Sequence, residues 1–381
     1  MKILHLTLGS RGGAAIAAKR ITEAQEYCGL DSKIINLSTT SMLSRISSKF
    51  DFELTKQNSQ AMTLSLARGV GYMKELSQII SDHDPTTIIN LHWLPGMLTN
   101  DVISKLRRLN VFWTLHDMNP FTSVCHHAFS CESFLQNCES CPQVSAAFRP
   151  TVRFSHYHKQ NIMEKLDSVK FVSPSLWMAD LALQSSIIRK RRVEVIPNPI
   201  PTTIFKPITK RRNGDDAFRI GILGASSGKG FDQNRSILDK IKNDAAITVR
   251  VFGGRMDGND KYTVENLPWS NSELVLAENL AECDLILYSS QADNLPNFVI
   301  EAQACGVTVI ASDTGGIGEI IQNEVSGYLF KNQNEAARII ESLVACREKV
   351  NNVKINARFS AVTKYSYQRI GELYEQLYRQ N

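Results

Sequence analysis

The residues with the clearest chemical potential lie in one segment of the C-terminal half, 293–306. Asp293 and Glu301 stand eight positions apart, and Pro296 precedes a stretch with helical character. Backbone N–H groups at a helix start favour anions, so this start predicts a phosphate-binding site. The amides expected to face the phosphate are those of Asn297, Phe298 and Val299. Glu301 is placed to accept hydrogen bonds from ribose hydroxyls and Asp293 from a sugar ring, although paired acids at a helix start are often only a cap.

Two neighbouring segments support a ligand site here. A buried strand is predicted over 307–311 and ends in a loop that contains Gly315 and Gly316. Another is predicted over 218–223, and the loop that follows it carries Lys229 and Gly230. In open parallel sheets, ligands bind at the carboxyl ends of the strands. We therefore expect these loops to meet at one edge of a sheet.

The N-terminal half offers a glycine loop and a histidine. Gly12 and Gly13 follow the first predicted strand and open a helix, where paired glycines let a ligand approach the backbone. The loop is not a complete G-x-G-x-x-G, and no acidic residue ends the second strand, which disfavours a dinucleotide dehydrogenase. His116 and Asp117 directly follow the predicted strand 111–115. A neutral imidazole there could donate to a substrate hydroxyl or phosphate, or it could simply cap a loop.

Four of the eight cysteines fall within 17 residues: Cys125, Cys131, Cys138 and Cys141. Four thiolates at this density have the ligand number of a structural Zn²⁺ site, and His126 or His127 could replace one of them. Their spacing is less regular than in zinc ribbons. Free or redox-active thiols and disulfides are the alternatives, the latter disfavoured in a reducing compartment. The other four cysteines are expected in the core.

Short β-branched runs alternate with helical stretches along the chain, which predicts βαβ units and parallel sheets. The best break is 198–207, with three prolines in ten residues, followed by a polar stretch at 210–216 that we interpret as a linker. We therefore predict an N-terminal Rossmann-like domain over 1–198 with a cysteine-rich insertion at 120–145. A second Rossmann-like domain over 199–360 follows, and a C-terminal helix over 361–381 is expected to pack back on the first domain.

Composition limits the function classes. The chain has 381 residues, 43% hydrophobic and 21% charged, which is ordinary for two globular domains. No apolar run approaches a membrane span, and the first residues do not read as a signal peptide, so we expect a cytoplasmic protein. Residues 1–198 carry 22 Lys and Arg against 16 Asp and Glu, while 199–381 carry 21 against 22. This balance is too weak for a nucleic-acid binder. It is compatible with peripheral contact at the inner face of a membrane, toward which the run 189–192 could turn.

The stretch from Asp293 to Gly316, with Glu301-Ala-x-Ala-x-Gly306 inside it, resembles the donor-site signature of retaining glycosyltransferases of family 4, among the glycosyl transferases group 1. The pair Lys229-Gly230, the glycines Gly12 and Gly13, the pair His116-Asp117 and the turn after Val195 are similar to other elements of that family. The words around His92 and after Asp117 resemble a bacterial branch that makes exopolysaccharides of the colanic-acid type.

The resemblance implies an α/β protein of the GT-B fold, with two Rossmann-like domains facing across a cleft. It implies that Lys229 neutralises a donor diphosphate, that His116 faces the transferred sugar, and that Asp293 contacts that sugar. The donor would be a UDP- or GDP-linked sugar and the acceptor a glycan or a lipid-diphosphate-linked glycan. Transfer would retain the anomeric configuration without a catalytic metal or other cofactor, leaving zinc in the cysteine segment a structural role only.

The sequence departs from the family at three positions. Asp293 stands where the family usually has Glu. The Arg usual about five residues before the lysine is absent, with Gly224 or Ala225 in its place, so diphosphate neutralisation rests on fewer charges here unless Arg255 or Arg235 substitutes. Asn119 replaces a Trp of the narrower branch.

Two other functions remain open from the sequence. A sugar-nucleotide epimerase on a similar two-domain fold would turn over its substrate without an acceptor. A non-catalytic carbohydrate-binding protein would bind a nucleotide sugar without releasing nucleotide.

Overall fold

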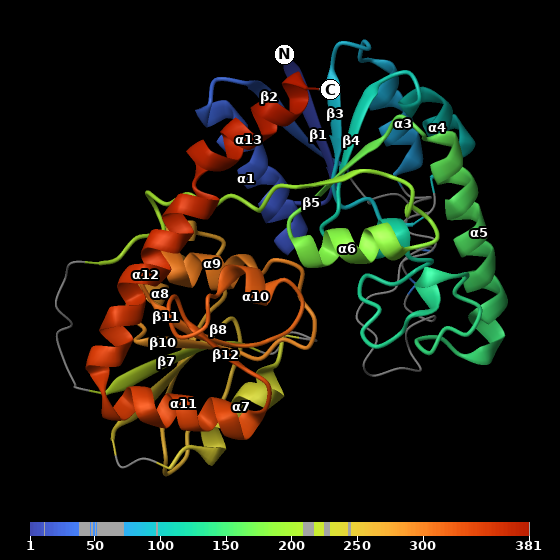
Figure 1. Cartoon of the computed structure of the whole chain (residues 1–381). Coiled ribbons are helices and arrows are strands. Elements are labelled where there is room, and N and C mark those ends of the chain that lie inside the picture. The colour runs from blue at the N-terminus through green and yellow to red at the C-terminus, as the bar shows by residue number, and fades with distance from the viewer. Residues whose placement is uncertain are drawn as a thin grey trace. The chain divides into compact units, whose positions relative to one another are not determined.

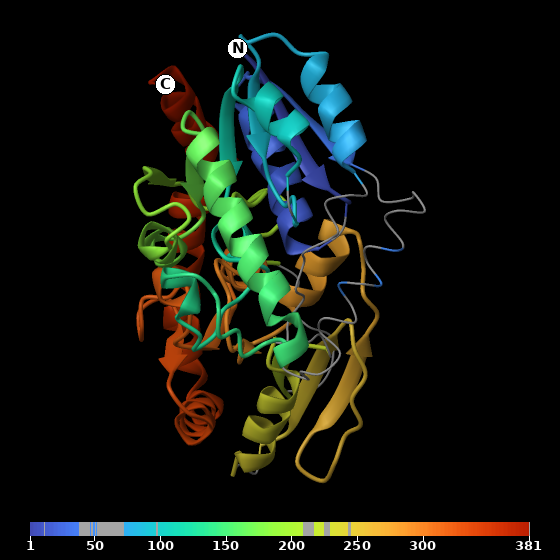
Figure 2. The same ribbon diagram turned by 90° about the vertical axis from the view of Figure 1, so that its right-hand side faces the viewer.

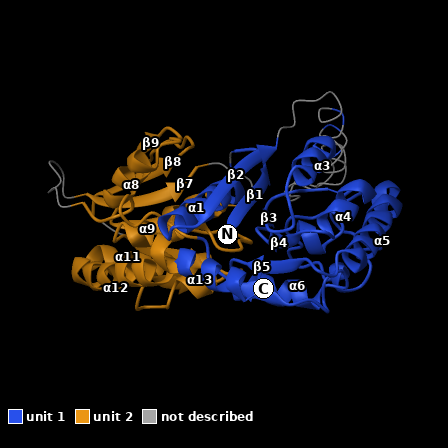
Figure 3. Cartoon of the chain, turned by 90° about the horizontal axis from the view of Figure 1, so that it is seen from above, with its two compact units in different colours: residues 1–198, 370–381 blue, residues 199–369 orange. Residues whose placement is uncertain are grey.

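The computed structural model describes residues 1–10, 12–37, 46, 49, 51, 72–96, 98–208, 217–224, 229–242 and 245–380. The predicted linker 210–216 and loop residue Ala225 lie outside these ranges. The chain forms two compact units: unit 1 comprises residues 1–198 and 370–381, and unit 2 comprises residues 199–369 (Figure 3). The second division thus falls after Arg369 instead of after residue 360. The reason is that the penultimate helix, α12 (Arg347–Tyr365), belongs to unit 2.

Unit 1 is built on a six-stranded parallel sheet in the order β2-β1-β3-β4-β5-β6 (Figure 1). Its strands are β1 (Lys2–Leu8), β2 (Asp31–Leu37), β3 (Ile88–Leu91), β4 (Asn110–Thr114), β5 (Lys170–Ser173) and β6 (Val193–Val195). Its helices are α1 (Gly13–Tyr27), α3 (Met73–Ser81), α4 (Asn100–Leu106), α5 (Arg149–Lys165), α6 (Leu176–Gln184) and α13 (Tyr367–Arg379). The central strands are buried along their length because helices cover both faces of a parallel sheet.

Helix α13 brings the end of the chain onto the N-terminal sheet, beside α1 (Figure 1). Gly371 permits this approach, because a Cβ there would stand 2.3 Å from the carbonyl oxygen of Ala24. The ring of Tyr378 packs edge-on against Phe112 at 4.9 Å between centroids. The Tyr378 hydroxyl accepts hydrogen bonds from the side-chain amides of Gln25 and Asn90, each at 3.2 Å. The last helix therefore completes the core of unit 1.

Unit 2 has its own six-stranded parallel sheet, in the order β12-β11-β10-β7-β8-β9. Its strands are β7 (Phe218–Leu223), β8 (Ile247–Phe252), β9 (Thr263–Leu267), β10 (Leu285–Tyr288), β11 (Thr308–Ser312) and β12 (Tyr328–Phe330). In the turned view, β8 and β9 run side by side at one edge (Figure 2). This is a doubly wound sheet whose order reverses between β7 and β10, where ligands bind in such sheets.

Six helices in the described part of unit 2 surround that sheet. They are α7 (Phe231–Lys240), α8 (Glu273–Ala281), α9 (Asn297–Ala304), α10 (Ile317–Ile320), α11 (Gln333–Ala345) and α12. Arg358 of α12 donates to the carbonyl oxygen of Ala304 at 2.6 Å and to that of Thr202 at 3.0 Å. This arginine ties α12 to the end of α9. No helix in the described part of the chain is both long enough and apolar enough to cross a membrane.

Candidate functional site

The reversal point of the unit 2 sheet brings Lys229 and Asp293 together. Lys229 follows β7 and Asp293 follows β10, and the Lys229 ammonium donates to Oδ2 of Asp293. The hydroxyl of Tyr288, the last residue of β10, donates to the same oxygen at 2.5 Å. Burial and the Asp293 charge hold the pKa of Tyr288 well above its usual range, so this phenol stays protonated and remains a donor. The sequence did not single out Tyr288.

Two glycines let the loops at this edge close on each other. A Cβ at Gly230 would lie 2.0 Å from the carbonyl oxygen of Ser289, and one at Gly315 would lie 1.9 Å from that of Asp293. Both glycines have left-handed backbones, with φ of 79° and 62°. The amide of Gly316 donates to the Asp293 carbonyl oxygen at 3.0 Å. The backbone of Asp293 is therefore fixed by the loop that follows β11.

Helix α9 begins directly after Pro296, where the sequence placed it. Glu301 is buried within it, with 4% of its surface exposed. Phe298 packs edge-on against Phe252 at 5.5 Å between centroids, so its side chain belongs to the core. The Val299 amide donates to the Pro296 carbonyl oxygen at 3.1 Å. Of the three amides expected to face a phosphate, that of Val299 is thus engaged within the helix.

Two buried polar side chains beside the Lys229 loop have no hydrogen-bond partner in the described structure: the amide of Asn234 and the hydroxyl of Ser289. The backbone of Gly230 lies next to both residues: its carbonyl oxygen accepts from the backbone N–H of Asn234 at 2.8 Å, and its Cα lies against Ser289. A buried polar group left without a partner costs about 1–3 kcal/mol. This place is therefore suited to a polar ligand or an ordered water.

Gly224 has no room for an arginine of the kind found in the glycosyltransferases that the sequence resembles. A Cβ there would stand 2.3 Å from the backbone nitrogen of Gly254. Of the two proposed substitutes, Arg255 follows that glycine just beyond the end of β8 and is exposed. Arg235 lies on α7, where its charge acts on Tyr262. Arg255 is consequently the better placed of the two relative to the Gly224 loop.

In unit 1, His116 follows β4, as the sequence predicted, and the carboxylate of its neighbour Asp117 makes its hydrogen bonds to other residues. The Asp117 carboxylate accepts from the indole of Trp93 at 2.9 Å, from the Asn119 amide at 2.9 Å, and from His126. Burial raises the pKa of Asp117, but the charge and hydrogen bond of His126 outweigh it and hold that pKa below its ordinary value. Asp117 therefore holds the loop that follows the strand.

His116 pairs with another histidine. Its Nε2 lies 2.9 Å from Nδ1 of His92, which directly follows β3. Burial lowers the pKa of His116 to about 4, so the ring is neutral at physiological pH. The sequence signal for His92 was its place at the end of a neighbouring strand, because the carboxyl ends of parallel strands share one sheet edge.

The glycine loop of unit 1 starts helix α1. Gly12 has φ of 91° and its carbonyl accepts from the Ile16 amide at 3.1 Å. Only glycine adopts this conformation readily. A Cβ at Gly12 or Gly13 would meet no atom within 4 Å. The loop thus presents an open backbone surface, the form that an anion or sugar can approach.

The four clustered cysteines are free thiols. Cys125, Cys138 and Cys141 are buried, and Cys131 is partly buried. Burial, together with the other three thiols, raises the pKa of Cys125, and burial raises that of Cys138 to about 11. In the described residues, no three or more His, Cys, Asp or Glu side chains are arranged to hold a metal ion. Zinc binding therefore stays a prediction that requires metal analysis.

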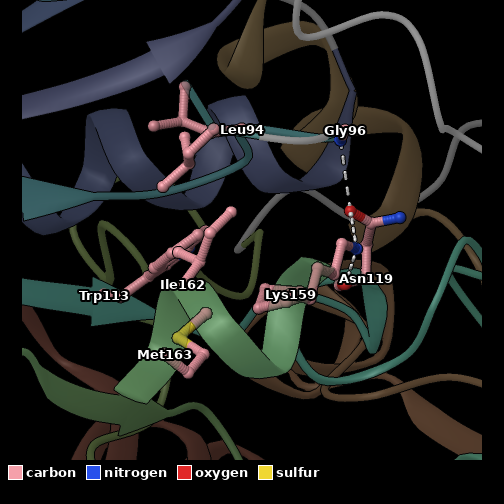
Figure 4. Close-up of a pocket in the computed structure, with 9 residues that line it drawn as sticks. Leu94, Gly96, Trp113, Asn119, Lys159, Ile162 and Met163 are labelled. Atoms are coloured by element: carbon pink, nitrogen blue, oxygen red, sulfur yellow. Dashed lines mark hydrogen bonds between the residues drawn. The ribbon is translucent and has the colours of Figure 1, made fainter. Parts of the chain in front are cut away.

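A small apolar pocket lies behind the loop that follows His116 (Figure 4). Residues lining it include Leu94, Trp113, Ile162 and Met163. Lys159 points from α5 to this loop and donates to the carbonyl oxygens of Asn119 at 2.6 Å and Thr122 at 3.1 Å. Burial lowers the pKa of Lys159 to about 8. The Asn119 side chain accepts from the Gly96 amide at 3.4 Å and donates to Val124 at 3.0 Å. The pocket is thus part of the loop's support.

Comparison with known proteins agrees with this geometry. Residues 226–359 match the family model described as glycosyl transferases group 1. Among curated proteins, the chain is 23% identical over 244 residues to WcaC of Escherichia coli K12, which carries the name of a colanic acid biosynthesis glycosyl transferase. It is 33% identical over 105 residues to N-acetyl-alpha-D-glucosaminyl L-malate synthase of Bacillus anthracis. These matches span 61% and 27% of the chain, and 58% and 28% of the relatives.

Solved structures match over the whole chain. Sucrose-phosphate synthase from Thermosynechococcus elongatus superposes with a TM-score of 0.69 at 17% identity, covering 100% of this chain and 99% of that one. HepE of Anabaena, solved in complex with UDP-glucose, superposes with a TM-score of 0.64 at 15% identity, covering 100% of both chains. These likenesses confirm the predicted α/β class and GT-B fold.

Proposed function

We propose that the protein is a glycosyltransferase that moves a sugar from a nucleotide-diphosphate sugar to a hydroxyl of a glycan or lipid-diphosphate-linked acceptor. The product would belong to a bacterial surface polysaccharide, as the name of the WcaC relative suggests. Unit 2 binds the donor and unit 1 the acceptor.

The observation that carries the proposal is the set of groups at the reversal point of the unit 2 sheet. These groups are Lys229, the Asp293 carboxylate that it contacts, and the start of helix α9 with the buried Glu301. All of them lie within the segment that matches the glycosyl transferases group 1 model. A cation and a helix N-terminus suit a diphosphate. Carboxylates suit the hydroxyls of ribose and a sugar. This combination matches both ends of a sugar nucleotide.

The protein's own groups supply the electrostatic part of catalysis. Lys229 and the first turn of α9 stabilise the charge that develops on the departing diphosphate, as preorganised donors and cations do in general. Asp293 holds a hydroxyl of the transferred sugar, and Glu301 holds the ribose. His116 orients a substrate hydroxyl in unit 1.

Retention of configuration follows if the acceptor attacks on the face that the diphosphate leaves. The acceptor oxygen bonds to the anomeric carbon, the bond from that carbon to the diphosphate oxygen breaks, and the acceptor's proton passes to the leaving diphosphate. No covalent enzyme intermediate is required, which fits the engagement of Asp293 with Lys229 and Tyr288.

We also propose that the protein contacts an anionic lipid surface, at the inner face of the membrane. Helix α5 exposes Phe154 and Tyr157, with 62% and 47% of their surfaces accessible. Arg149, Arg153 and Lys165 are exposed on the same helix. Aromatic rings flanked by cations are typical of surfaces that contact anionic headgroups. Phe154→Ser should reduce the fraction of protein that sediments with phosphatidylglycerol vesicles. An unchanged fraction would refute the proposed lipid contact of helix α5.

Donor binding is the decisive experiment. Calorimetric titration with UDP and GDP, followed by assays of nucleotide release from their sugar derivatives, should identify one donor. Lys229→Gln and Glu301→Gln should each weaken that binding about 10- to 100-fold, the value of one hydrogen bond to a charged group. Lys240→Gln and Glu278→Gln, both exposed in unit 2, are the matched controls.

The same assays separate the other functions. Conversion of the sugar nucleotide without an acceptor would indicate an epimerase. Binding without nucleotide release, across glycan and lipid-linked acceptors, would indicate a binding protein. Equal donor affinity in the two variants and the wild type would refute the donor site.

A further inference from the structure

Three histidines, two of them buried and the third partly exposed, form a continuous hydrogen-bonded row in unit 1. Nδ1 of His5, in the middle of β1, lies 2.7 Å from Nε2 of His92, and Nδ1 of His92 lies 2.9 Å from Nε2 of His116. The rings stack with centroid separations of 5.0 and 5.1 Å. At the inner end, Nε2 of His5 lies 2.9 Å from Oε1 of Gln25. His116 is therefore the outer member of a chain that begins in the core.

The inner end fixes the direction in which the hydrogen bonds of this histidine row, called the histidine chain below, are donated. An amide oxygen only accepts hydrogen bonds, and Oε1 of Gln25 also accepts from the Ser32 hydroxyl at 2.8 Å. His5 must therefore carry its proton on Nε2 and accept on Nδ1. A neutral imidazole has one donor and one acceptor nitrogen, so His92 donates from Nε2 and accepts on Nδ1. His116 in turn donates from Nε2.

Burial keeps the two inner rings neutral, so each has one donor and one acceptor nitrogen. Burial lowers the pKa of His5 to about 4, and it holds the pKa of His92 well below its ordinary value. The two rings are almost completely buried. The orientation of Gln25 is supported by its amide nitrogen, which donates to the Tyr378 hydroxyl. Helix α13 thereby closes the inner end of the chain.

We propose that Gln25, His5 and His92 are positioning residues that fix the tautomer of His116. With the His116 proton held on Nε2, the nitrogen with a lone pair is Nδ1. In the reaction proposed above, on which this step rests, Nδ1 then accepts a hydrogen bond from a substrate hydroxyl. A lone pair repels a phosphate oxygen, so the chain makes His116 selective for hydroxyl groups over phosphate.

The tautomer can be read directly by nuclear magnetic resonance. Protein labelled with ¹⁵N in its histidine rings gives long-range proton–nitrogen correlations that distinguish the protonated nitrogen from the unprotonated one. His116→Gln identifies the His116 signals by their loss. We expect the wild type to show one neutral tautomer of His116, protonated on Nε2. Protonation on Nδ1 would mean that the chain runs in the opposite direction and would overturn the proposal.

Substitutions at His92 separate positioning from general packing. In His92→Gln, the glutamine oxygen can accept from His116 while its nitrogen donates to His5, so we expect the Nε2 tautomer to persist. In His92→Phe both bonds are lost, and His116 should become a mixture of tautomers. His156→Phe is the control. His156 is also buried in unit 1, but it takes no part in the histidine row and instead bonds the hydroxyl of Ser186 at 2.9 Å. Should His92→Phe fail to fold, the wild-type spectrum still decides the tautomer.

Activity supplies an independent readout. Turnover should fall about 10- to 100-fold in His92→Phe, the loss expected when a partner that orients a functional histidine is removed, and His92→Gln should restore most of it. If His116 held a fixed Nε2 tautomer but the protein transferred no sugar, the positioning role of the histidine chain would stand and the proposed function would be refuted. Equal tautomer populations of His116 in His92→Phe and His92→Gln would refute the positioning role.

Discussion

Substituting Asp293 by Asn should have opposite effects on nucleotide and nucleotide-sugar binding. In the structure, the cation assigned to the diphosphate is paired with the carboxylate assigned to the sugar. A nucleoside diphosphate must therefore draw Lys229 away from Asp293, or share it. Asparagine has nearly the same shape and still accepts from Tyr288, but it no longer competes for the ammonium with a full charge.

The size of the effect follows from the exposure of the pair. The side chains of Lys229 and Asp293 are 29% and 11% exposed, so solvent screens the pair only in part. Removing the competing carboxylate should strengthen UDP or GDP binding by about 1 kcal/mol, the upper value for an accessible ion pair, or about fivefold. Binding of the sugar-bearing donor should instead weaken by about 1.5–3 kcal/mol relative to the bare nucleotide, because a charged acceptor for a sugar hydroxyl is lost.

Calorimetric titration of the two ligands into wild type and Asp293→Asn measures both effects. Asp257→Asn removes a carboxylate from an exposed loop of unit 2 and should change neither affinity. Transfer by Asp293→Asn should fall even where the nucleotide binds more tightly. If Asp293→Asn bound the nucleoside diphosphate more weakly than the wild type while Asp257→Asn did not, competition within the ion pair would be refuted.

Three further predictions follow from the site. The free energy of unfolding should be greatest above pH 6.5 and should fall as the pH drops toward 4, because the unfolded chain binds protons that the His5 and His116 rings, with pKa values of about 4, do not. His5 alone should account for a loss of about 2 kcal/mol at pH 5. Denaturant melts at each pH measure this loss, and a flat profile would contradict it. Arg255→Gln should weaken nucleotide binding several-fold while Arg235→Gln leaves it unchanged, and the reverse order would exchange their roles. Metal analysis of protein purified without chelator should give about one zinc per chain, and removal of that zinc should disorder the cysteine segment 125–141. Metal-free protein with an unchanged melting curve would refute the zinc site.

The strands of the fold could be predicted where they are buried on both faces. The runs 218–223 and 247–252 are mainly apolar or β-branched, each interrupted by one arginine, and β7 and β8 have those bounds. β9 is an edge strand with mostly exposed residues, so it leaves no apolar pattern from which it could be predicted. The start of helix α5 is equally hard to predict: it begins at Arg149, with Pro150 in its first turn. Its exposed first turn carries little apolar periodicity.

The tail of the chain shows a different limit. Helix α12 was not predicted, although its buried residues recur at helical spacing: Val350, Val353, Ala357, Ala361 and Tyr365. Two of the five are alanines, which mark a helix face only weakly. The boundary between the units depends on this helix and on Arg358, whose bonds reach carbonyl groups far away in the sequence. Such contacts leave no local signal.

The candidate sites were predictable to the extent that they depend on strand ends. Lys229 and Asp293 are 64 positions apart, yet each follows a strand of the same parallel sheet, and strand order alone brings them to one edge. What the sequence could not show is that they pair with each other. That contact depends on the reversal of strand order between β7 and β10, and on glycines that let the loops approach within contact distance.

His116 gives the reason why sequence neighbours are a poor guide to the role of a residue at a strand end. The pair His116-Asp117 suggests a histidine oriented by the adjacent carboxylate, but both residues lie in the bend beyond the end of β4, where that carboxylate accepts from Trp93, Asn119 and His126. Asp117 accordingly serves the loop, while His116 takes its partner from the neighbouring strand, 24 positions earlier, and that partner takes its own from a strand 87 positions before it. A histidine in this place acquires its donor and acceptor properties from the order of strands in the sheet. A substitution in the core, at a position remote from any ligand, can therefore change what the histidine recognises.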